Sequence, residues 1–83
     1  MYTLRISTKA RKEIKKISQL YQDEILGTLR ELKENPYLGK PLERDFIEYY
    51  TYKVGVYRII YKINEKDQKV EVISAGHRST IYQ

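Results

Sequence analysis

The chain has 83 residues and no cysteine, which favours one domain, residues 1–83, and excludes disulfides and zinc–thiolate sites. Its apolar stretches are only a few residues long and it begins without an apolar signal segment, so we expect a cytoplasmic protein that neither spans a membrane nor is secreted. Sixteen Lys and Arg against 11 Asp and Glu give a formal net charge of +5, which favours an anionic partner.

The first 34 residues predict one strand and two helices. Residues 2–7 alternate between apolar and polar side chains, which is typical of a half-buried strand. Ser7 or Thr8 then offers an N-cap for a helix that starts at about Lys9. Helical spacing recurs in two apolar stripes, formed by Ala10, Ile14, Ile17 and Tyr21 and then by Ile25, Leu29 and Leu32. The second helix should end at about Glu34, because Pro36 disfavours helix at the residue before it.

The second half changes to a period of two. Turn residues in segment 35–45 predict a loop. Alternating segments then predict strands over 47–54, 57–64 and 69–76. A strand and two helices followed by a run of strands indicate an α+β fold, and we expect a four-stranded sheet with both helices on one face.

The two faces of that sheet should differ in chemistry. Alternation places the tyrosines 50, 52, 57 and 61 on the face that packs against the helices. The opposite face then carries Lys53, Arg58 and Lys62, with Tyr49 as an exposed ring on which a base could stack. One solvated face with cations on adjacent strands can receive a phosphate backbone, so Lys53, Lys62 and Tyr49 are candidate RNA-binding residues.

Three features in this order resemble one known family. A loop with Asn35-Pro36 and Leu42 follows the strand–helix–helix segment; residues 53–61 form a central hairpin with a Tyr-Arg pair; and the last strand leads into Gly76-His77-Arg78 and then Tyr82. The chain is similar, over essentially its whole length, to the RelE/ParE superfamily of toxins from toxin–antitoxin systems.

The resemblance implies a function, with one alternative. RelE-like members cut messenger RNA in the ribosomal A site, whereas ParE-like members bind DNA gyrase and tend to lack the nuclease residues. Arg58, Arg78, Tyr82 and Lys53 match the RelE-like positions. They imply a type II toxin and endoribonuclease, with a cognate antitoxin and ribosome-bound messenger RNA as partners and a heterotetramer with the antitoxin as one assembly. Thr51 departs from the pattern, because a second basic residue stands there in the family.

The implied chemistry needs no metal or other cofactor. The substrate's 2′-OH attacks the adjacent phosphorus and expels the 5′-oxygen, which requires a base, an acid and positive charge at the phosphorane. Arg58 is assigned to the phosphorane with Arg78 as a second clamp, since guanidinium binds two phosphate oxygens at once. Lys53 is a candidate base or a further cation, Tyr82 a candidate acid, base or stacking ring, and His77 the alternative proton shuttle. Acidic residues without paired spacing, a single His and no Cys predict no metal site.

Overall fold

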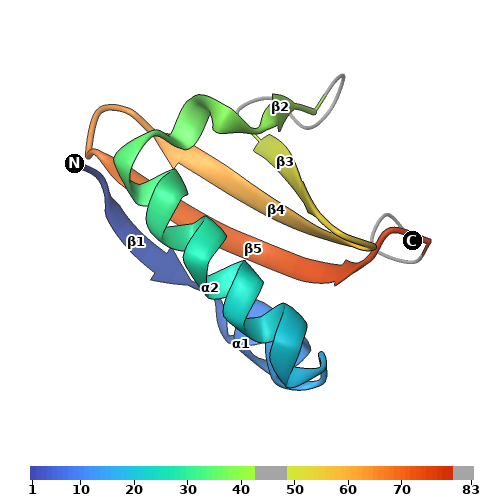
Figure 1. The fold of residues 1–83 in the computed structure, drawn as a ribbon. Helices are drawn as coiled ribbons and strands as arrows, with labels where there is room; N and C mark the ends of the chain where they lie inside the picture. The colour runs from blue at the N-terminus through green and yellow to red at the C-terminus, as the bar shows by residue number, and fades with distance from the viewer. Residues whose placement is uncertain (43–48, 80–83) are drawn as a thin grey trace.

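Figure 1 shows two helices lying across one face of a curved sheet. The computed structural model describes residues 1–42 and 49–79. The elements follow the order β1 (Thr3–Ile6), α1 (Thr8–Lys15), α2 (Gln19–Glu34), the 3₁₀-helix η1 (Pro36–Leu38), β2 (Lys40–Pro41), β3 (Tyr49–Val54), β4 (Tyr57–Asn64) and β5 (Lys69–His77). The α+β class and the order of strand, two helices and strands are as predicted.

The sheet has five strands in the order β1-β5-β4-β3-β2. β1 runs parallel to β5, and the other neighbours are antiparallel. The predicted number of four strands was wrong because β2 lies inside the segment predicted as loop. Its two residues are too few to show a period, and proline at Pro41 is tolerated because β2 lies at the sheet's edge. The predicted start of the third strand, residues 47 and 48, lies outside the described residues.

The start of α1 and the end of α2 lie where local chemistry predicts them. The Ser7 side chain accepts a hydrogen bond from the Ala10 N–H at 3.0 Å and caps α1. α2 ends at Glu34, immediately before Asn35-Pro36. The apolar stripes of both helices are buried against Ile59, Tyr61, Val70, Val72 and Ala75 of the sheet. Within the described residues, no helix is both long and apolar enough to cross a membrane.

The fully buried Tyr61 ties the segment before β2 to the sheet. Its hydroxyl donates a hydrogen bond to the Pro36 carbonyl at 2.6 Å and accepts one from the Gly39 N–H at 3.0 Å. Burial raises the pKa of Tyr61 to about 12. A Cβ at Gly39 would lie 2.3 Å from the same hydroxyl and 2.7 Å from the Thr51 carbonyl oxygen, so only glycine allows this close approach. Tyr61 thereby determines where Lys40 enters the sheet.

The turn between β3 and β4 contains only Gly55 and Val56. Gly55 has a φ of 59° and Val56 does not have a positive φ, which is the pattern of a type II′ turn. A Cβ at Gly55 would lie 2.7 Å from Cε1 of Tyr21 in α2. The ring of Tyr21 also meets that of Tyr57 edge to face, with centroids 5.1 Å apart. The turn is therefore packed against a helix and holds the β3–β4 register.

Candidate nucleic-acid interface on the open sheet face

Cross-strand pairing brings two of the predicted site residues together. Lys53 of β3 lies directly opposite Arg58 of β4. Directly paired residues of antiparallel strands point to the same side of the sheet. Their neighbours Tyr52 and Ile59 form the next pair, and Ile59 is fully buried beneath the helices. Lys53 and Arg58 therefore share the face opposite the helices, where Lys53 is exposed and Arg58 half-buried.

A third cation on this face was missed by sequence reasoning. Lys40 of β2 pairs directly with Thr51 of β3 and therefore points to the same side as Thr51 and Lys53. Thr51 is buried, and it also pairs with Ile60 on its other side. The exposed Lys40 thus stands beside the position where the family pattern has a second basic residue. A two-residue strand shows no alternation, so this placement had no periodic signal in the sequence.

A hollow of about 360 Å³ lies among these side chains. It is lined by Leu38, Gly39, Lys40, Thr51, Tyr52, Lys53 and Arg58. Of the lining residues within the described part of the chain, three are cationic and none is acidic, so the hollow favours an anionic ligand. Its cations come from three adjacent strands, β2, β3 and β4.

Arg78 follows β5 at the same end of the sheet. Its backbone N–H donates a hydrogen bond to the Val56 carbonyl at 2.9 Å, one step beyond the last ladder pair, Tyr57 with His77. Gly76 pairs with Arg58, so Arg78 is two residues beyond the partner of Arg58. Such diagonal neighbours have Cα atoms about 7–8 Å apart, within reach of two arginine side chains. Tyr82, the other predicted residue at this end, lies outside the described residues.

His77 is not brought together with these cations. It pairs with Tyr57, and the two rings meet edge to face with centroids 6.0 Å apart. Tyr57 packs on Tyr21 of α2, so His77 lies on the helix side of the sheet, opposite Arg58. The Nδ1 atom of His77 accepts a hydrogen bond from the Ser79 N–H at 3.1 Å. Its role as a proton shuttle stays a prediction, and this geometry gives it no support.

Tyr49 and Lys62, the other predicted RNA-binding residues, lie farther along the open face. They are directly paired, and the Lys62 ammonium is 6.0 Å from the Tyr49 ring centroid. Lys62 is four residues from Arg58 on β4, a separation of about 13 Å. The two residues therefore belong to the same face as Arg58 but not to its hollow.

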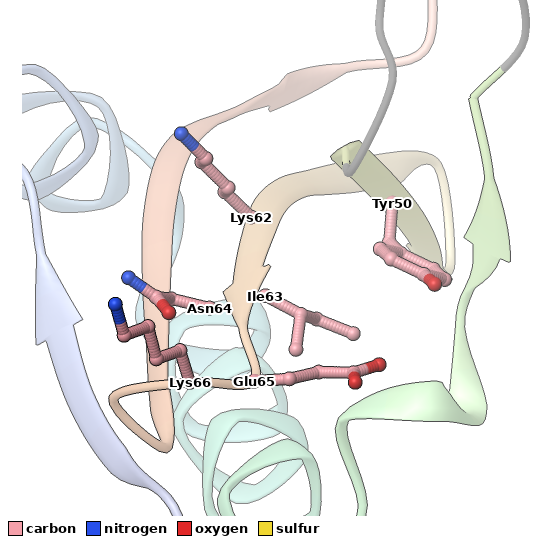
Figure 2. Close-up of a pocket in the computed structure, with 6 residues that line it drawn as sticks. All are labelled: Tyr50, Lys62, Ile63, Asn64, Glu65 and Lys66. Carbon is pink, nitrogen blue, oxygen red and sulfur yellow. The ribbon is translucent and has the colours of Figure 1, made fainter.

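The hollow in Figure 2, of about 440 Å³, lies at the far end of β4. Ile63 and Glu65 point to one side of the strand there, while Lys62 and Asn64 point to the other. The Tyr37 hydroxyl of η1 donates a hydrogen bond to the Glu65 carboxylate, and this bond raises the pKa of Tyr37. None of the arginines predicted for catalysis lines this hollow, so it is not the candidate active site.

Metal ligands do not gather anywhere in the described ranges. In residues 1–42 and 49–79, no group of three or more His, Cys, Asp or Glu side chains is placed to hold an ion. The charged side chains that line the hollow beside Arg58 are those of Lys40, Lys53 and Arg58 itself.

Residues 4–82 match the model of a protein family described as "ParE toxin of type II toxin-antitoxin system, parDE". The chain belongs to this toxin family. It is thus a toxin of a type II toxin–antitoxin system, within the RelE/ParE superfamily that its motifs indicated.

Individual relatives of the toxin carry RelE-type names. It is 29% identical to Toxin RelG of Mycobacterium tuberculosis over 84 residues. The matched region covers 99% of this chain and 97% of the relative. Its fold is similar to the toxin–antitoxin complex RelBE2 of M. tuberculosis, with a TM-score of 0.86, 28% identity, and coverage of 93% of this chain and 98% of that chain. The isolated RelE toxin of E. coli gives a TM-score of 0.81 at 28% identity, with 99% and 92% covered.

Proposed function

We propose that the toxin is a metal-independent endoribonuclease that cleaves messenger RNA in the ribosomal A site. The observation that carries the proposal is the direct pairing of Lys53 with Arg58 on the helix-free face, in a hollow that also contains Lys40. The RelE-type names of its relatives support the same function.

The cations have defined roles in this reaction. The 2′-oxygen attacks phosphorus and gives up its proton to a base, while the 5′-oxygen leaves and accepts a proton from an acid. The products are a 2′,3′-cyclic phosphate and a free 5′-hydroxyl. Arg58 binds the non-bridging oxygens, whose negative charge grows in the transition state, and Arg78 approaches from the next strand. Lys53, directly opposite Arg58, serves as base or as additional positive charge.

Lys40 compensates for the threonine at position 51. Thr51 is buried and uncharged, so it cannot supply the second basic group of the family pattern. Lys40 is its direct cross-strand partner and lines the same hollow as Lys53 and Arg58. The hollow therefore still contains three cations, and one of them, Lys40, comes from the edge strand β2.

A cognate antitoxin is the proposed protein partner. The M. tuberculosis RelBE2 structure is a toxin–antitoxin complex, and so is the intact RelBE structure of E. coli. An antitoxin that covered the basic open face would exclude RNA from it, and an acidic segment would be complementary in charge. A heterotetramer of two toxins and two antitoxins is the proposed assembly.

A gyrase-binding toxin is the second candidate function, favoured by the ParE name of the matching family model. That function requires a surface for a protein partner and does not require a phosphate-binding hollow. The two candidates therefore differ in what Arg58 does, and Arg58 provides the test.

The experiment compares Arg58→Ala with Arg30→Ala, a matched control at an exposed arginine of α2. Each toxin is added to a reconstituted translation reaction, and transcript ends are mapped by primer extension. Loss of the arginine at a phosphorane should lower cleavage by about 10²–10³-fold, with an unchanged melting temperature, while the control stays active. Full cleavage by Arg58→Ala would refute the assignment. Intact transcripts together with double-strand DNA breaks in cells would establish the gyrase function instead.

A further inference from the structure

A second group of cations lies on the open face, away from the candidate active site. Arg5 of β1, Lys62 of β4 and Lys69 of β5 line a hollow of about 380 Å³, together with Thr3, Asn64 and Glu71. We name these three cations the distal cluster. Since β4, β5 and β1 are neighbours, the cluster lies across the half of the sheet that β2 and β3 do not occupy.

The strand register explains why these side chains converge. Glu71 of β5 pairs with Arg5 on one side and with Lys62 on the other. Lys69 pairs in the same way with Thr3 and Asn64. Two rows of side chains therefore cross three strands on one face, and Lys62 shares that face with Arg58 because burial alternates regularly along β4.

The distal cluster keeps a net positive charge. Among the described residues that line the hollow, only Glu71 is acidic, and its carboxylate lies 4.0 Å from Arg5 Nε. The Arg5 side chain is 79% exposed, so this ion pair is screened by water and leaves Arg5 accessible to an anion. The described residues that line the hollow, three cations and one carboxylate, carry a formal net charge of about +2.

We propose that the distal cluster binds the phosphate backbone of the same RNA strand whose scissile phosphate lies at Arg58, so the inference rests on the proposed nuclease function. Arg58 and Lys62 are about 13 Å apart along β4, too far to share one phosphate. Tyr49 lies directly beside Lys62, at the end of the cluster that faces the active site. Its ring can stack on a base of the strand between the two phosphate sites. The toxin then holds RNA over the length of the sheet and not only at the cut.

The test measures binding without cleavage. Fluorescence anisotropy follows a 2′-O-methyl RNA of twelve nucleotides, which lacks the attacking hydroxyl, and a three-nucleotide version that can reach only one site. The test variant combines Arg5→Gln, Lys62→Gln and Lys69→Gln. The matched control removes the same charge from three exposed lysines on the other side of the sheet, two in α1 and one at its C-cap, by Lys12→Gln, Lys15→Gln and Lys16→Gln. Thermal melts verify that both variants are folded.

The long RNA should bind the test variant about tenfold more weakly than the wild type, and the slope of log K against log salt should become less steep by about 0.7 for each phosphate that the variant no longer neutralises. The control variant should bind the long RNA about as tightly as the wild type does. The test variant should bind the short RNA about as tightly as the wild type does. Equal affinities of the two variants for the long RNA would overturn the proposal, as would an equal loss for both RNAs. If the test variant keeps its affinity for RNA but no longer binds the antitoxin, the cluster belongs to the interface with the protein partner, and the proposal is overturned as well. Failure of the nuclease function appears separately, as cleavage that survives Arg58→Ala.

Discussion

Replacing Tyr61 by phenylalanine tests how the buried hydroxyl holds the edge of the sheet. The substitution keeps the ring stacked on Tyr50, with centroids 5.7 Å apart, and removes only the hydroxyl. The Pro36 carbonyl loses a hydrogen bond in a buried place, whereas the Gly39 N–H is partly exposed and can turn to water. An unpaired buried group costs about 1–3 kcal/mol and an ordinary hydrogen bond about 1 kcal/mol, so we expect a loss of about 2–3 kcal/mol in the free energy of unfolding.

Urea unfolding followed by circular dichroism measures this loss. In a domain of this size it corresponds to a fall of about 10–20 °C in Tm. Tyr52→Phe is the matched control, because no hydrogen bond of the Tyr52 hydroxyl is found among the described residues. Cleavage by Tyr61→Phe should also fall, since the segment before Lys40 loses its anchor. Equal stabilities of the Tyr61 and Tyr52 variants would refute the reasoning.

The difference in stability between the wild type and Tyr61→Phe should depend on pH. The pKa of Tyr61 rises from its ordinary value of 10 to about 12 in the folded state, so the folded protein holds this proton when the unfolded chain has lost it. The stabilisation, about 2–3 kcal/mol, is fully present below pH 10 and is lost as the pH rises from 10 to 12. The wild type's advantage over Tyr61→Phe should therefore shrink in that window. A constant difference in urea midpoint from pH 8 to 11.5 would contradict the assignment.

Three further substitutions test the supports of the open face. Gly55→Ala should lower stability by about 1–2 kcal/mol, because its φ is 59° and a Cβ would lie 2.7 Å from Tyr21 Cε1. Gly27→Ala in α2 meets no atom within 4 Å and should raise stability by about 0.5–1 kcal/mol, so chemical denaturation should give opposite signs. Glu13→Ala should cost about 1–3 kcal/mol, because the carboxylate accepts a hydrogen bond from the Ala75 N–H at 3.2 Å, close to a shift in the β4–β5 register between Ile60 and Tyr61. An unchanged melting temperature for Glu13→Ala would show that water replaces the carboxylate there.

Periodicity was sufficient to predict the fold class and the long elements. Apolar stripes with a clear start at Ser7 and a stop before Pro36 defined the helices, and alternation through β4 defined its buried face. β2 was not predictable in this way, since two residues carry no period and its pairing with Thr51 depends on how Tyr61 anchors the preceding segment. Lys40 was missed for that reason.

The site was predicted less completely than the fold because it depends on register. Lys53 and Arg58 could be placed on one face from local alternation across a short turn. His77 follows Gly76 in sequence, but only the long-range pairing of β5 with β4 reveals that Gly76 lies opposite Arg58 and that His77 therefore points to the other side. Adjacent residues in a strand point to opposite faces of the sheet. Closeness in sequence suggested that His77 shares a site with the arginines, whereas the sheet places its side chain on the opposite face from Arg58.

The parallel pairing of β1 with β5 has a consequence for synthesis. Leu4 pairs with Val70, and the Ser7 hydroxyl donates a hydrogen bond to the Ile73 carbonyl at 2.9 Å, so the first strand has no partner strand until residues 69–77 have left the ribosomal tunnel. Contacts this distant in sequence close late and slowly. A nascent toxin should therefore remain harmless for most of its translation, which gives a newly made antitoxin time to meet it as it folds.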